Sequence, residues 1–217
     1  MKASGRPIRL AVAGIGLLPF LMLAFGAATD RLGPDPPERI LHETGEWALR
    51  CLVVSLAITP LRKWTGWTAL AMHRRTFGLL AYFYATLHFT SYLVFDLGLD
   101  WGELAHSIGE RPYITIGFLT WLMLTPLALT STRSAMRRLG RRWVTLHKIA
   151  YAAVLLAVVH FLWAVKADTL EPLIYGSLAV LLLGSRLLSQ RPKGTGQKRK
   201  TCATLRRPST DPNRDPV

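Results

Sequence analysis

Apolar residues in this chain gather in six long runs, and charged residues bound each of them. The runs cover residues 8–28, 45–61, 76–97, 113–132, 147–165 and 172–188. At about 1.5 Å per residue, helices of this length approach or match the hydrocarbon core of a bilayer, which is about 30 Å thick. The runs are too evenly apolar for the helices of a soluble bundle. The pattern therefore predicts an all-α polytopic membrane protein with a six-helix transmembrane bundle.

Positive charge follows the connections between these runs in an alternating way. The chain has 217 residues and a formal net charge of +14, and 22 of its 27 Lys and Arg residues fall on one side of the six predicted spans. Because basic connections stay on the cytoplasmic side of a membrane, both termini are expected in the cytoplasm. The same placement assigns the basic clusters to the lipid surface, and we expect no nucleic-acid partner.

The chain divides into a membrane domain and a short tail. Residues 1–190 contain all six runs, whereas residues 191–217 are basic and poor in apolar side chains, which predicts a disordered cytoplasmic tail. A tail of this length is too short for a flavin and nicotinamide domain. The first run begins like a signal peptide, with basic residues before it and small residues at its end, but its length favours a retained span.

Two histidines lie thirteen residues apart in the segment 141–165. In a helix, His147 and His160 are separated by roughly 20 Å, so that one imidazole lies near each face of the hydrocarbon core. Ionisable groups are costly there, and those that occur usually serve a ligand, a proton path or a metal. Neutral imidazole is a common haem ligand. The alternative is a histidine that only hydrogen-bonds a neighbouring helix.

The third run carries a matching histidine, His88. The third and fifth spans both run outward in the predicted topology, so His88 and His160 should lie at one outer depth and could clamp a b-type haem. Arg74, fourteen residues before His88, would lie with His147 at the inner depth. Thirteen residues at 100° each miss a common helix face by roughly 140°. We therefore expect a kink or bulge in the fifth span, or haems of different orientation.

Other polar residues have simpler explanations. Arg50 follows Glu46 by four residues, which predicts a salt bridge within one helix, although an arginine there could instead bind a haem propionate. His42 and His106 fall in outer acidic connections and are expected to be solvated. Pro36 and Pro37 predict that the first outer loop becomes helical only after them. A short surface helix is expected at 103–108.

Three motifs resemble a known family. They are LHFTSY around His88, RRWVTLHKIAY around His147 and VVHFLW around His160. Together, over roughly residues 8–188, they resemble the MsrQ family, the haem-binding subunits of the periplasmic protein-methionine-sulfoxide reductase system, which belong with ferric-reductase-like transmembrane domains. The resemblance implies that His88 and His160 ligate one haem b and that His147 belongs to a second haem position. Opposite His147, Arg74 or Arg75 occupies the place of a fourth histidine.

The resemblance also implies a function. It predicts a bacterial inner-membrane subunit that passes electrons from quinol, with FMN as a further cofactor, to a periplasmic molybdenum-containing methionine sulfoxide reductase that repairs oxidised proteins. Substrate catalysis would then lie in the partner. Two alternatives remain open: a stand-alone ferric or oxygen reductase of the cytochrome b type, and a small transporter or assembly factor without a cofactor.

Overall fold

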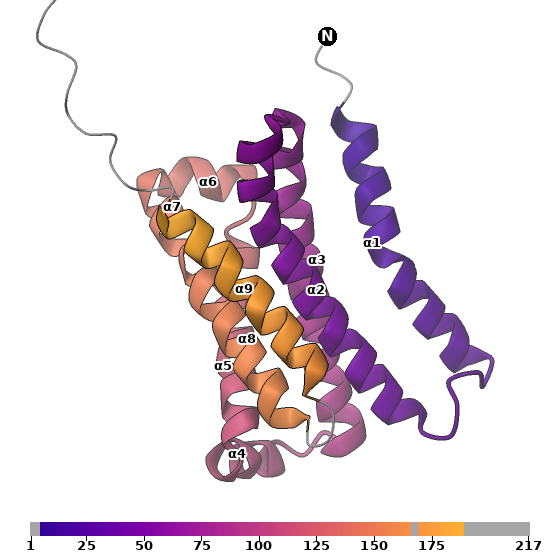
Figure 1. The fold of residues 1–217 in the computed structure, drawn as a ribbon. Coiled ribbons are helices and arrows are strands. Elements are labelled where there is room, and N and C mark those ends of the chain that lie inside the picture. The colour runs from indigo at the N-terminus through magenta and orange to yellow at the C-terminus, as the bar shows by residue number, and fades with distance from the viewer. Residues whose placement is uncertain (1–4, 166–168, 189–217) are drawn as a thin grey trace, which may run out of the picture.

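The protein is a bundle of helices (Figure 1). The computed structural model describes residues 5–165 and 169–188, so the predicted tail at 191–217 lies outside the described residues. The helices are α1 (Gly5–Ala28), α2 (Pro36–Thr65), the 3-10 helix η1 (Thr68–Met72), α3 (His73–Ser91), the π-helical η2 (Tyr92–Asp96), α4 (Trp101–Glu110), α5 (Pro112–Leu129), α6 (Arg133–Leu139), α7 (Arg141–Leu146), α8 (Ile149–Ala164) and α9 (Leu170–Leu188). The described residues form no strand, which confirms the all-α class.

Four of the six predicted spans are long and apolar enough to cross a membrane. They are Pro7–Ala28, Thr68–Asp96, Pro112–Leu129 and Arg141–Ala164. The other two predicted spans are the helices α2 and α9, which lie in the same bundle and carry charged residues such as Glu46 and Arg186. The protein is thus a polytopic membrane protein, and a count of six crossing helices stays a prediction.

The two ends of the bundle differ in the elements that close them. We call the end with α6 and α7 the basic end, and the opposite end, with α4, the acidic end (Figure 1). The helices α3 and α8 both run from the basic end to the acidic end, as the predicted topology requires. The short helix expected at 103–108 is α4, and it is capped by Asp100, whose side chain accepts hydrogen bonds from the backbone of Gly102 and Glu103.

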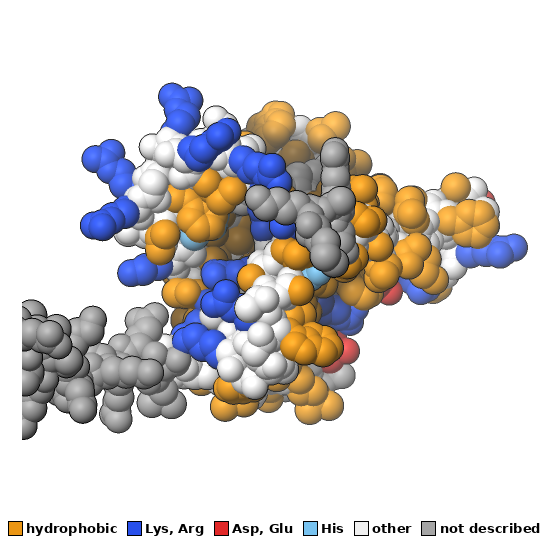
Figure 2. Space-filling view, turned by 90° about the horizontal axis from the view of Figure 1, so that it is seen from above, with side chains coloured by type: hydrophobic (Ala, Val, Ile, Leu, Met, Phe, Trp, Pro, Cys, Tyr) orange, Lys and Arg blue, Asp and Glu red, His pale blue; other side chains and the backbone are white. Residues whose placement is uncertain are grey.

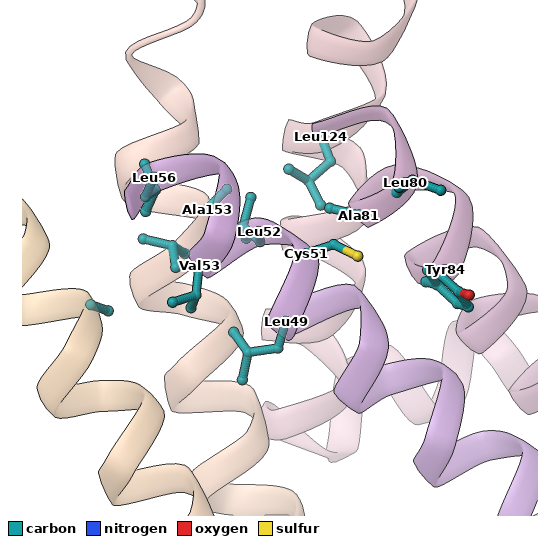
Figure 3. Close-up of a cluster of buried hydrophobic side chains, with 12 residues drawn as sticks. Leu49, Cys51, Leu52, Val53, Leu56, Leu80, Ala81, Tyr84, Leu124 and Ala153 are labelled. Carbon is teal, nitrogen blue, oxygen red and sulfur yellow. The ribbon is translucent and has the colours of Figure 1, made fainter. Parts of the chain in front are cut away.

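The core lies where α2 meets α3 and the second helix pair, α5 and α8, closes over it. Figure 3 shows this cluster of buried side chains. Its members are Leu49, Cys51, Leu52, Val53, Leu56, Leu80, Ala81, Tyr84, Leu124, Ala153, Val154 and Ala179. Ala81, Ala153 and Ala179 are fully buried, because small side chains let neighbouring membrane helices approach closely. The core therefore fixes the lateral position of the helices that carry the histidines.

The second helix begins earlier than the sequence indicates. Pro36 and Pro37 form its first turn, with Asp35 as the N-cap, so the expectation that the helix starts only after them was wrong. Proline is accommodated at this place because the first N–H groups of a helix have no partner within it. The expected amphipathic stretch and the span at 45–61 are one continuous helix. It ends at Gly66, whose φ of 74° permits the left-handed cap.

The fifth span is interrupted, as its histidine spacing predicts. α7 ends at Leu146 and α8 begins at Ile149, so the break falls at His147 and Lys148. A straight helix would turn His147 and His160 to different faces. Because of the break, the orientation of His147 does not follow from the helical periodicity of α8.

Tyr84 attaches α1 to the rest of the bundle. Its hydroxyl donates to the Gly16 carbonyl at 2.7 Å and accepts from the Phe20 N–H at 3.3 Å. These two backbone groups would otherwise bond each other within α1, so the tyrosine inserts into the helix ladder. Tyr84 is 1% exposed, whereas most of α1 is surface. The packing of α1 therefore depends strongly on one side chain.

Replacing Tyr84 by alanine should destabilise the protein, because the change removes both a large buried ring and the hydrogen bonds to α1. We expect the midpoint of thermal unfolding to fall by at least about 5 °C, measured by circular dichroism at 222 nm in one detergent. Phe95→Ala, which removes an exposed ring from η2, is the matched control. Equal midpoints for the two variants would contradict this role of Tyr84.

Candidate functional site

His88 on α3 and His160 on α8 face each other across the bundle. Their ring centroids are 6.0 Å apart, and the ring planes are inclined by 78°. The two side chains are distant in the sequence, and the parallel course of α3 and α8 brings them to one level. The structure therefore brings together the pair of histidines that the sequence places at a common outer depth.

A backbone carbonyl fixes each imidazole from a neighbouring helix. His88 Nδ1 lies 2.9 Å from the Leu41 oxygen on α2, and His160 Nδ1 lies 2.7 Å from the Tyr113 oxygen on α5. A carbonyl can only accept, so each Nδ1 carries the proton and donates it. In the neutral ring, Nε2 is then the nitrogen with a free lone pair. Histidines that bind metals are commonly oriented in this way by their second nitrogen.

A glycine clears the space beside each ring. A Cβ atom added to Gly45 would lie 3.0 Å from His88 Nδ1, and one added to Gly117 would lie 2.7 Å from His160 Nδ1 and Cε1. In both cases the glycine is four residues after the carbonyl that accepts the hydrogen bond, and the histidine is 43 residues after the glycine. The two helix pairs thus build the same local arrangement twice.

The paired rings border a cavity of ≈ 320 Å³. Side chains of α2, α3, α5 and α8 line it, and most of the lining is apolar or aromatic, including Phe89, Phe118 and Trp121. Phe89 stacks on Trp121 with centroids 4.9 Å apart. Aromatic side chains therefore form part of the cavity wall beside His88. Tyr92, Asp96 and Arg111 add polar groups toward the acidic end.

Arg50 does not itself line this cavity. Its Nη2 lies 2.6 Å from Glu46 Oε2, and its Nε donates to the Tyr175 hydroxyl on α9 at 2.9 Å. The salt bridge within α2 is present as expected. Glu46 lines the cavity, but Arg50 is not among the lining residues. Binding of a propionate by Arg50 stays a prediction.

A second group of nitrogen atoms lies toward the basic end. His147 Nδ1 bonds the Trp143 carbonyl at 3.1 Å, and its ring stacks on Trp143 with centroids 3.9 Å apart. Its Nε2 is buried and makes no hydrogen bond of normal geometry to a described residue, although the Leu127 backbone lies close to the ring. Arg74 lies near enough to His147 for an electrostatic interaction, whereas Arg75 is exposed. The structure thus places Arg74, rather than Arg75, beside this histidine.

His73 is a further candidate that the sequence interpretation missed. It is the first residue of α3, and its Nδ1 is buried with no hydrogen-bond partner within the described part of the chain. Fifteen residues separate it from His88, which places the two within about 60° on an ideal helix. Extending the search one residue beyond Arg74 would have found it.

The two remaining histidines are exposed at the acidic end. His106 lies 3.1 Å from Glu110 Oε1, and its side chain is 60% exposed. His42 lies 3.9 Å from Glu38 Oε1 at the border of the cavity. Both agree with their expected solvated positions.

Comparison with known proteins identifies the family. The profile described as "Ferric reductase like transmembrane component" matches residues 44–158. The "Protein-methionine-sulfoxide reductase heme-binding subunit MsrQ" of Xanthomonas campestris pv. campestris (strain 8004) is 52% identical over 159 residues, 73% of each chain. The protein of the same name from Bordetella pertussis (strain Tohama I) is 49% identical over 174 residues, 79% of this chain and 84% of the relative. The chain belongs to the MsrQ family. No solved structure matches it.

No further metal-ligating side chain joins His88 and His160 in the described part of the chain to form a metal site. Residues 5–165 and 169–188 contain no group of three or more His, Cys, Asp and Glu side chains that could hold a metal. A metal ion between His88 and His160 would therefore need ligands from outside the protein, and a porphyrin supplies four nitrogen atoms in a plane.

Proposed function

We propose that His88 and His160 ligate the iron of one haem b through their Nε2 atoms. Metal–imidazole bonds of about 2.0–2.1 Å, as seen on zinc, separate two opposed nitrogens by about 4 Å. Half a ring on each side brings the ring centres to about 6 Å, and the observed separation is 6.0 Å. This separation is the observation that carries the proposal. The fixed Nδ1–H groups and the glycine clearances support it.

The surrounding residues suit a flat, largely apolar cofactor. The aromatic and aliphatic lining would keep water from a bound haem, and Gly45 and Gly117 let both rings pack closely on the neighbouring helices. Bound haem b would supply a one-electron carrier between a donor and an acceptor. The protein's part is to hold both imidazoles neutral and oriented, so that the same ligands remain in place in both oxidation states.

A second haem position at the basic end is part of the proposal. His147 offers a buried Nε2, and Arg74 lies beside it, while His73 offers a buried Nδ1 on α3. FMN, a cofactor that the family resemblance implies, is also proposed. The residues Arg74, Arg75 and Arg50 stay candidates for contacts to the acidic groups of these cofactors.

The proposed activity is electron transfer to a methionine sulfoxide reductase. The name of the relatives pairs a haem-binding subunit with this reductase. A quinol gives up two electrons and two protons as it becomes a quinone. Methionine sulfoxide takes up two electrons and two protons to become methionine and water, so one quinol balances one repaired residue. The reduction itself would take place on a periplasmic, molybdenum-containing partner.

Membrane placement completes the proposal. We place residues 1–190 as one domain in the bacterial inner membrane, with the basic end and both termini toward the cytoplasm. The described helix ends Gly5 and Leu188 lie at the basic end, which agrees with this orientation (Figure 1). The acidic end would then face the periplasmic partner.

Replacement of either paired histidine should remove the same haem. His88→Ala and His160→Ala each delete one axial ligand, so we expect the b-type reduced-minus-oxidised signal of this haem to disappear. The measurement is visible spectroscopy with a pyridine haemochrome assay for haem per chain. His106→Ala is the matched control, because His106 is exposed and bonds Glu110. Loss of haem in the control alone would contradict the assignment, and a wild-type protein without haem would overturn the function.

Adding one methyl group at Gly117 should disturb the same haem without touching a ligand. The new Cβ would overlap the His160 ring, which is also held by Tyr113. We expect Gly117→Ala to lower haem per chain or shift the haem's reduction potential, measured by redox titration. Gly14→Ala is the control, because a Cβ at Gly14 meets no atom within 4 Å. Unchanged haem content and potential in Gly117→Ala would show that His160 is not constrained as proposed.

The donor can be tested separately from the haem. Menaquinol added to the detergent-purified wild type should reduce the haem, and oxidised methionine together with the partner should reoxidise it. The measurement is the absorbance of the reduced haem over time. Reoxidation by ferric iron or oxygen, with none by the partner, would favour the stand-alone reductase instead.

A further inference from the structure

Arg186 is a buried cation near the last turn of α9, at the basic end. The residue is 7% exposed, and its Nη2 donates to the Leu56 carbonyl on α2 at 2.6 Å. This carbonyl is free because Pro60, four residues later, has no N–H to donate. One of the guanidinium's donors therefore has a structural role. The hydrogen bond to the Leu56 carbonyl does not account for the other donors of the guanidinium.

Two of the nitrogen atoms of Arg186 lack partners. Nε and Nη1 are both buried without a hydrogen bond to any described residue. The guanidinium also lies 5.0 Å from the centroid of the Tyr151 ring, and the Tyr151 side chain stabilises its charged form. A guanidinium cannot lose its charge in a protein, so burial leaves a permanent positive charge with unused donors.

The described part of the chain supplies no counter-ion at this end. Every Asp and Glu in residues 5–165 and 169–188 falls between 30 and 46, between 96 and 110, or at position 171. These segments lie toward the acidic end. Arg74 lies near enough to interact electrostatically with both Arg186 and His147, and it adds a second positive charge. Two neighbouring cations in a membrane protein are costly without an anion between them.

Figure 2 looks onto the basic end. Lys and Arg side chains gather on this face, few Asp and Glu side chains are visible on it, and basic side chains border a hollow at its centre. An anionic ligand would therefore be attracted to this end and could approach from it.

We propose that Arg186, with Arg74 beside it, binds an oxyanion of a ligand that enters the basic end of the bundle. The oxyanion is a carboxylate or a phosphate, because the planar fork of arginine presents Nε and an Nη in parallel to two oxygen atoms of such a group. The candidate sources are the phosphate of FMN, a propionate of a haem near His147, and the headgroup phosphate of an anionic lipid. The site does not depend on the haem between His88 and His160.

Binding to Arg186→Gln tests the proposal. Glutamine keeps a donor for the Leu56 carbonyl but removes the charge and the fork. The probes are FMN against riboflavin, and phosphatidylglycerol against diacylglycerol, each added to delipidated protein and measured by native mass spectrometry, together with haem per chain. A hydrogen bond between charged groups predicts about ten- to hundredfold weaker binding of one phosphate-bearing probe, or the loss of one haem per chain.

Controls distinguish the three possible sources of the oxyanion from one another, and from the effect of removing any positive charge at the basic end. Arg138→Gln removes an exposed arginine from α6 at the same end and should bind every probe like the wild type. Riboflavin and diacylglycerol, which have no phosphate, should bind both variants equally. A selective loss of FMN, of phosphatidylglycerol or of one haem identifies the source. Equal binding of all three by Arg186→Gln and Arg138→Gln overturns the proposal.

The structural role of Arg186 can be removed from the comparison. Pro60→Ala restores an N–H for the Leu56 carbonyl, so this carbonyl no longer needs Arg186. If Arg186 only satisfies this carbonyl, then Arg186→Gln in the Pro60→Ala background should bind all ligands normally, and the proposal fails. A persistent loss supports the oxyanion site. Should Arg186→Gln fail to fold, Arg74→Gln must weaken the same ligand selectively, and unchanged binding there also overturns the site.

Discussion

A buried neutral imidazole has one nitrogen that donates a hydrogen bond and one that accepts a hydrogen bond. The candidate site depends on which ring nitrogen carries the proton. The carbonyls of Leu41 and Tyr113 fix the tautomers, because they accept hydrogen bonds from the Nδ1–H groups of His88 and His160. Both Nε2 atoms are then left for a ligand in the space between α3 and α8. Without these two hydrogen bonds, the rings could adopt either tautomer and rotate, and a shared ligand would not be specified.

This constraint links the site to the packing of the bundle. α2 must lie against α3, and α5 against α8, closely enough for a carbonyl and a ring to meet. Gly45 and Gly117 make that approach possible, one in each helix pair. The buried core at Ala81 and Ala153 holds the pairs together on the same helices. The spacing from the carbonyl to the glycine to the histidine is the same in both helix pairs, so the same local arrangement of hydrogen bond and clearance occurs twice.

The basic end differs from this site, because several of its buried nitrogen atoms have no hydrogen-bond partner among the described residues. His147, His73 and Arg186 each keep a buried nitrogen without a partner among the described residues. Buried polar groups in proteins are generally satisfied, so these nitrogens are expected to have partners outside the described residues. The carboxylates of the described residues lie toward the acidic end, where Glu46 pairs with Arg50 and Glu110 lies near His106. Charge in the described part of the molecule is therefore separated along the bundle axis.

The sequence by itself determined the helical class, most of the helix positions and the pairing of His88 with His160. These features follow from the lengths of the apolar runs, from the alternation of basic connections and from the positions of the histidines along the runs. Each of these can be read from a short segment of the sequence or summed over such segments. It also indicated the break at His147, because thirteen residues do not fit one helix face. It misplaced the start of α2 at Pro36, since proline breaks a helix in its middle but not in its first turn.

Only the tertiary structure decided which groups meet across helices. The hydrogen bonds of His88 and His160 join residues 47 apart, and the contact of Arg186 with Leu56 joins residues 130 apart. No periodicity within one segment contains these pairings, because they depend on the rotation and separation of packed helices. The same reason explains why Arg186 looked like one more basic residue near the tail. Its burial, and its unused donors, arise only where α9 packs against α2 and α8.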